Sequence, residues 1–202
     1  MHRQLTAIAR LLLCLALAVA GAPAPAAADF LVEPFWAWSR NPPQPAGAEA
    51  RWHPGGGVAA DWTSGMLIVG GEVGYASGFF DPPQDVFDLV QTSHVLTASG
   101  SAGVTRAYAA RRRLLPYATA GLGLMRQQAR DRAGVIDVTR NDPALNFGGG
   151  ARVLLKNYVG LRGDLRYYRS LTTADPASDL ASDLSRLGFW RISAGVVFRF
   201  GD

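Results

Sequence analysis

Charge and cysteine are both scarce in this chain. Only 18% of its 202 residues are charged, below the roughly 25% that is usual for soluble globular proteins. Lys156 is the single lysine beside 19 arginines, and the formal net charge is only +4. Nucleic-acid binding would need a clustered basic face, so it is not expected.

The chain also lacks an apolar run of the roughly 20 residues that a membrane-spanning helix needs. Its longest apolar run is 11–20, which follows Arg3 and Arg10 and precedes a segment of small residues ending at Ala28. This order is typical of a secretory signal peptide, so we predict that residues 1–28 are removed on export. The one cysteine, Cys14, lies in this segment. The remaining domain, residues 29–202, therefore has no disulfide, thiolate metal site or cysteine nucleophile.

Hydrophobic residues alternate with polar or small ones along most of the domain, which indicates β-strands. In the last segment, Trp190, Ile192 and Phe198 share one face, whereas Arg191 and Arg199 lie on the other. We expect eight strands, at 30–39, 56–62, 67–75, 96–105, 116–126, 145–155, 159–171 and 189–200.

The connections between these strands alternate in length, which predicts an up-and-down topology. The short ones are 63–66, 106–115 and 156–158; the long ones are 40–55, 76–95, 127–144 and 172–188. We therefore predict an all-β fold, an eight-stranded antiparallel transmembrane β-barrel with an apolar outer face. A soluble lipocalin-like barrel, with apolar residues inside and polar residues outside, is the alternative.

The polar face of the strands carries most of the strand charges. An eight-stranded barrel is filled by its own side chains, and a lone buried arginine would cost several kcal/mol, so inward charges should pair. We predict an interior charge network of Glu33, Glu72, Arg152, Arg162, Asp164, Arg166, Arg191 and Arg199.

Four short segments, 70–75, 116–123, 146–150 and 159–167, together resemble the small outer-membrane β-barrels of the OmpA and OmpX type. The resemblance implies the cell outer membrane as location, with lipid and lipopolysaccharide as surroundings, both termini in the periplasm, and periplasmic chaperones and the outer-membrane insertion machinery as partners. Ser193, Gly195, Phe198 and Phe200 resemble the C-terminal signal that this machinery reads. A monomer is expected.

Other patterns point less clearly to chemistry. Ser93 and His94 invite comparison with lipid-cleaving barrels, but the sequence places no acid beside them to complete a catalytic triad. Trp36, Trp38 and Trp190 near strand ends are typical of an interfacial aromatic girdle. We expect no cofactor, no metal and no catalysis. The predicted role is structural, with surface loops for adhesion, surface interaction or envelope integrity; a narrow or gated channel and a lipid-modifying enzyme remain alternatives.

Overall fold

The structure is a computed structural model that describes residues 28–40, 51–79, 90–105, 114–131, 137–172 and 187–201. Residues 1–27 of the predicted signal peptide lie outside this part of the chain. No helix among the described residues is long and apolar enough to cross a membrane.

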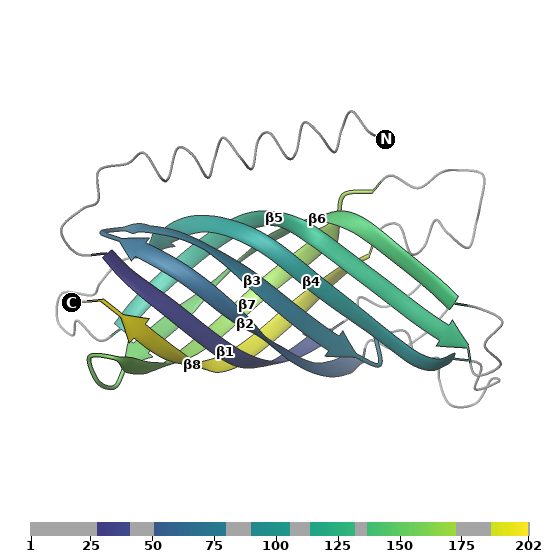
Figure 1. The fold of residues 1–202 in the computed structure, drawn as a ribbon, viewed down its shortest axis with the longest axis horizontal. Coiled ribbons are helices and arrows are strands. Elements are labelled where there is room, and N and C mark those ends of the chain that lie inside the picture. The colour runs from purple at the N-terminus through teal and green to yellow at the C-terminus, as the bar shows by residue number, and fades with distance from the viewer. Residues whose placement is uncertain are drawn as a thin grey trace.

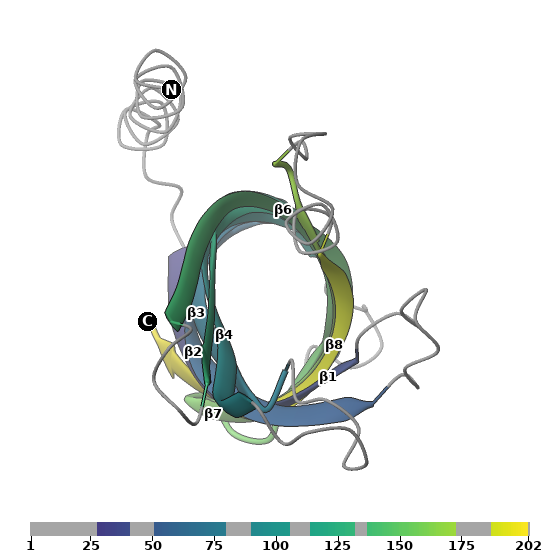
Figure 2. The ribbon, with the colours of Figure 1, turned by 90° about the vertical axis from the view of Figure 1, so that its right-hand side faces the viewer.

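Eight antiparallel strands close into one barrel, in which each strand pairs with its sequence neighbours and β1 pairs with β8 (Figures 1 and 2). The strands are β1 (Ala28–Arg40), β2 (Trp52–Ser64), β3 (Leu67–Ser77), β4 (Val90–Thr105), β5 (Leu114–Asp131), β6 (Asp137–Leu154), β7 (Val159–Ser170) and β8 (Gly188–Phe200). The predicted eight-stranded up-and-down barrel is confirmed.

The two ends of the barrel differ in what joins the strands. At one end, here the turn end, β1 begins and β8 ends, and the connections are 65–66, 106–113 and 155–158. The tight turn after β2 uses Gly65 at a φ of 59°, a conformation that favours glycine. At the opposite end, here the loop end, the connections are 41–51, 78–89, 132–136 and 171–187. Both described chain ends lie at the turn end (Figure 1).

The third long connection was predicted wrongly. Residues 127–144 were expected to form a loop, but β5 and β6 continue through most of them, with Gln127 opposite Arg140 and Arg130 opposite Asp137. Only residues 132–136 connect the two strands, so long and short connections do not alternate strictly. Where the structure describes side chains of this segment, polar residues occupy both faces, with Gln127 and Arg140 inward and Gln128 and Asn141 outward. Hydrophobic alternation therefore does not mark these strands.

The two faces of the barrel are sorted as the alternation predicted. The outward face is apolar, with Trp36 70% exposed, Leu165 47% exposed and Phe198 42% exposed. The inward face holds buried charged residues such as Glu33 and Arg152. This arrangement is opposite to that of a lipocalin, in which the apolar face lines the interior.

Two glycines on β3 and β7 illustrate the difference between the faces. A Cβ added at Gly74 would point inward and meet the Arg191 guanidinium at 2.6 Å and the Thr97 hydroxyl at 3.0 Å. A Cβ added at Gly163 would point outward and meet nothing within 4 Å. The absence of a side chain at Gly74 therefore makes room for the interior Arg191.

Candidate functional site

Glu33 lies at the centre of one half of an ion-pair network inside the barrel. Its side chain is completely buried. The carboxylate forms ion pairs with Arg152, whose Nε lies at 2.5 Å, and with Arg162, whose Nη1 lies at 2.7 Å. Arg152 also pairs with Asp61 of β2. One acidic side chain of β1 is thus bound to two arginines that come from β6 and β7, across the lumen.

Glu72 lies at the centre of the other half. Its carboxylate pairs with Arg191 of β8, with Arg162 Nη2 at 3.3 Å and with Arg166 Nη1 at 3.8 Å. Arg162 joins the two halves, because it pairs with both Glu33 and Glu72. Asp164 reinforces this link at 3.5 Å from Arg162 Nη2 and 3.4 Å from Arg166 Nε. The network therefore spans the interior from wall to wall.

Neutral side chains complete the network. The Tyr117 hydroxyl donates to Asp164 at 2.8 Å, and the Tyr168 hydroxyl donates to Glu72 at 2.7 Å. The rings of the same tyrosines lie against guanidinium groups, with Arg152 4.4 Å from the Tyr117 centroid and Arg191 4.7 Å from the Tyr168 centroid. Such cation–π contacts stabilise a desolvated guanidinium further.

The charges in this arginine–carboxylate network balance. Its four carboxylates are Glu33, Asp61, Glu72 and Asp164, and its four guanidinium groups are Arg152, Arg162, Arg166 and Arg191. Removing one member of a buried ion pair leaves the other charge uncompensated, which strongly destabilises the folded protein. The balance therefore lets all eight side chains occupy a low-dielectric interior together.

Seven of the eight residues predicted for the network come together, and Arg199 does not. Arg199 points inward at the turn end, where its Nε lies 2.8 Å from the Asp29 carboxylate and both side chains are more than a quarter exposed. Asp61 was missed, because strand 56–62 was assigned without sorting its faces. Ala59 and Asp61 share one parity, which would have identified the residue.

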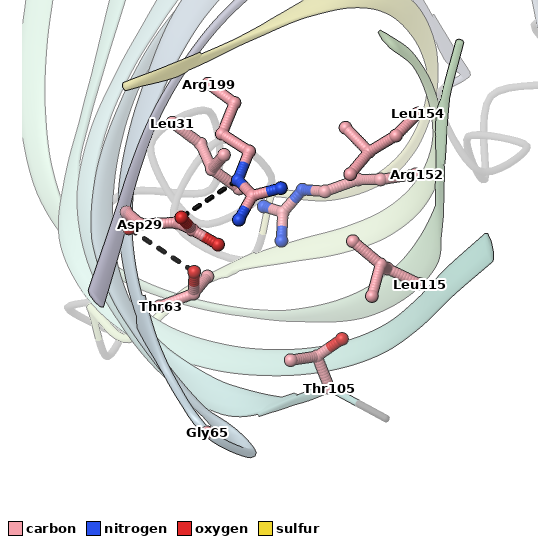
Figure 3. Close-up of a pocket in the computed structure, with 9 residues that line it drawn as sticks. All are labelled: Asp29, Leu31, Thr63, Gly65, Thr105, Leu115, Arg152, Leu154 and Arg199. Carbon is pink, nitrogen blue, oxygen red and sulfur yellow. Dashed lines mark hydrogen bonds and ion pairs between the residues drawn. The ribbon is translucent and has the colours of Figure 1, made fainter. Parts of the chain in front are cut away.

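A cavity of about 260 Å³ lies at the turn end of the barrel, and both Arg199 and Arg152 line it (Figure 3). Leu31, Leu115 and Leu154 supply its apolar lining, and Arg152 lines it from the network. The Arg199–Asp29 pair also lines it. Access from the turn end therefore stops at the paired charges of the network.

At the loop end, an apolar cluster covers the network. It comprises Ala76, Phe79, Val95, Met125, Ala144, Tyr168, Leu187 and Phe189, all buried. Phe79 belongs to the β3–β4 connection, where Gly78 at a φ of 66° turns the chain and donates its backbone N–H to the Ser93 carbonyl at 2.8 Å. The Phe79 ring packs edge-on against Phe189 at 5.0 Å. We call this cluster the apolar cover.

Aromatic side chains on the outward face form a group near the loop end. Tyr167 and Trp190 lie 5.0 Å apart between ring centroids, and Phe147 lies 5.4 Å from Tyr167. Phe30 marks the turn end of β1 and Trp38 its loop end. For a strand that rises about 3.3 Å per residue and tilts by about 40°, they lie roughly 20 Å apart along the barrel axis. This spacing is close to the height of a membrane-spanning apolar band, about 25 Å.

The other candidate residues do not form a catalytic arrangement with one another. Ser93 is buried inside the barrel, whereas His94 lies on the outward face, 5.5 Å from the Tyr75 ring. Adjacent strand residues point to opposite faces, so these two side chains cannot act together. Among the described residues, no group of three or more His, Cys, Asp or Glu side chains could hold a metal ion.

The residues of the predicted insertion signal lie along β8 on both faces. Ser193 is buried inside, and a Cβ added at Gly195 would meet the Cβ of Phe35 at 2.8 Å. Phe198 and Phe200 point outward, and Phe200 lies 6.4 Å from the Phe30 ring on the neighbouring strand. Recognition of this segment stays a prediction.

Comparison with known proteins identifies the family of this chain. Residues 12–200 match the family described as "Outer membrane protein beta-barrel domain". No curated protein matches the chain by sequence.

Solved structures share the fold. Neisserial surface protein A is similar with a TM-score of 0.65 and 16% identity, over 85% of this chain and 97% of that protein. A major outer membrane protein from Thermus thermophilus has a TM-score of 0.56 and 15% identity, over 86% and 99%. Ail of Yersinia pestis has a TM-score of 0.51 and 16% identity, over 84% and 98%. With its apolar outer face and eight-stranded closed barrel, the chain belongs to the outer membrane protein beta-barrel domain family and is an integral β-barrel of the outer membrane.

Proposed function

We propose that this protein is a closed, non-catalytic barrel that anchors surface segments in the outer membrane and conducts no solutes. The observation that carries the proposal is the filled lumen, in which the arginine–carboxylate network reaches from wall to wall and the apolar cover lies over it. An eight-stranded barrel has no spare interior width once such side chains occupy it.

The closed lumen predicts an absence of conductance. The refolded protein in a planar bilayer should show no discrete current steps, under conditions in which a general porin does. Phe189→Ala, which removes part of the apolar cover, should also remain silent, because the ion-paired layer beneath it is intact. Reproducible steps from the unmodified protein would instead favour the narrow-channel alternative.

The second part of the proposal is that the barrel displays segments at the cell surface. Segments 41–50 and 173–186 both connect strands at the loop end, opposite the end where β1 starts and β8 finishes. We expect this end to face the cell exterior and the turn end to face the periplasm.

An epitope tag tests this orientation. Inserted in segment 41–50, it should bind antibody on intact cells. The matched insertion between Gly65 and Met66, in the turn at the opposite end, should bind only after the outer membrane is permeabilised. The reverse labelling pattern would show that the barrel is inserted the other way round and would end the display role of these segments.

Export and insertion follow the same proposal. Residues 1–28 act as the signal peptide, periplasmic chaperones carry the unfolded domain, and the insertion machinery reads Ser193, Gly195, Phe198 and Phe200. The exposure of Phe198 and Phe200 on the outward face supports this role, because side chains that neither pair nor pack inside the barrel are available to a recognition surface.

A further inference from the structure

Three arginines break the apolar character of the outward face. Arg40 of β1, Arg126 of β5 and Arg169 of β7 are all exposed on outward-facing positions of their strands. β1 and β5 are four strands apart in the closed barrel, so the arginines are distributed around it rather than gathered on one side. We call these three residues the arginine belt.

The arginine belt lies at one level, just beyond the aromatic group at the loop end. Arg40 is two positions beyond Trp38 on β1, and Arg169 is two positions beyond Tyr167 on β7. Arg126 lies opposite Leu96 of β4, which in turn lies opposite Tyr75 of β3. Arg40 and Arg169 thus lie next to aromatic residues of their own strands, and Arg126 lies two strands from Tyr75. This is the level where a membrane passes from hydrocarbon to headgroups.

Within the described part of the chain, the belt has no acidic neighbour on the outward face. Of the outward-facing strand positions whose side chains the structure describes, none is Asp or Glu. Arg126 and Arg169 have no ion-pair partner within the described ranges. Arg40 lies over the ring of Trp52, 5.7 Å from its centroid. The interior shows the opposite pattern, because there every arginine of the network is paired with a carboxylate.

Among the residues that the structure describes, the turn end has no matching belt. Arg199 is paired with Asp29 and points inward. In the part of the chain that the structure describes, Lys156 in the β6–β7 turn is the exposed cation at that end. Among the outward-facing strand positions whose side chains the structure describes, the arginines therefore all lie at the loop end.

We propose that the arginine belt binds the phosphate groups of a lipid headgroup in the leaflet that surrounds the loop end. The permanent positive charge of a guanidinium attracts a phosphate group, and aromatic side chains at the same level pack against the adjacent lipid. The partner is a phosphorylated membrane lipid, such as the lipopolysaccharide expected around the barrel. The proposal does not depend on whether the lumen conducts.

The belt can be tested by lipid binding to the full refolded barrel. The protein is placed in nanodiscs of phosphatidylcholine that contain a titrated amount of bis-phosphorylated lipid A, and retained lipid is measured by native mass spectrometry. Attraction of about fivefold in affinity per arginine predicts that R40Q/R126Q/R169Q binds on the order of a hundredfold more weakly. K156Q, the matched loss of one exposed cation at the turn end, should bind as the unmodified protein does.

Three further measurements separate the contributions of the arginine charge, the lipid phosphate and free phosphate. R40K/R126K/R169K keeps the charge and should retain binding within about threefold; it also serves if the glutamine variant does not refold. Dephosphorylated lipid A should bind as weakly as the glutamine variant does. Inorganic phosphate at matched phosphate concentration should not displace the lipid. Unchanged binding by the glutamine variant, a loss of binding in the lysine variant or an equal loss in K156Q would overturn the proposal. Equal binding of dephosphorylated lipid, or displacement by free phosphate, would also overturn it.

Discussion

Replacing Leu165 with arginine should destabilise the barrel by roughly 2 to 4 kcal/mol, the cost of an arginine near the midplane of the membrane on the lipid-facing side. Leu165 is 47% exposed on the outward face of β7, opposite Gly149 and Ile192. The measurement is the free energy of unfolding by urea, for protein refolded in lipid vesicles.

Two variants control for position and for size. Leu155→Arg places the same charge on a residue that is 52% exposed at the turn end, where the cost should fall to about 0 to 1 kcal/mol. Gly163→Ser, two residues from Leu165 on the same outward face, should be tolerated, because a Cβ there meets nothing. A harmless Leu165→Arg together with a damaging Gly163→Ser would mean that the inward and outward faces have been assigned the wrong way round.

Glu72→Gln should cost about 3 to 5 kcal/mol, although the side chain keeps its size. The substitution removes the negative charge that Arg191, Arg162 and Arg166 share, and leaves a net positive charge buried in the lumen. Unfolding by urea in vesicles again measures the loss. Heat-dependent mobility on gels gives an independent check that the variant still forms a closed barrel.

A double-mutant cycle identifies the charge balance as the cause. Glu72→Gln combined with Arg191→Gln restores neutrality, so the pair should cost less than the sum of its two single variants. Asp29→Asn breaks a partly exposed ion pair with Arg199 and should cost less than about 1 kcal/mol. Strict additivity in the cycle would show that Glu72 matters through its packing and not through its charge.

Much of the fold could be predicted because lipid outside and a filled lumen inside impose opposite requirements on neighbouring residues. Alternation such as Trp190–Arg191–Ile192 is therefore strong where both requirements act. It fades in 127–144, where β5 and β6 extend beyond the apolar band and polar residues such as Gln127 and Gln128 occupy both faces, so the pattern predicts a loop there. The ends of β5 and β6 in this region are held together by backbone pairing between the two strands. Such pairing does not depend on the hydrophobicity of the side chains.

The interior residues were predictable as a set but not as partners. Parity alone places Glu33, Arg152 and Arg162 on the inward face. It also placed Arg199 there, and Arg199 does point inward, yet its carboxylate partner is Asp29 at the turn end and not a carboxylate of the network. Position along the barrel axis depends on the stagger between strands, which is a property of the closed sheet.

The sequence by itself therefore determined the eight strands, their inward and outward faces and the need for interior charges to be neutralised, because each of these depends on local alternation and on the cost of burying charge. Only the tertiary structure decided which charges meet. Closure of the barrel brings Glu33 of β1 against Arg152 and Arg162 of distant strands, and it brings Phe79 over the lumen. It also sets Arg40, Arg126 and Arg169 at one level, because the register between neighbouring strands fixes the height of every residue on the wall.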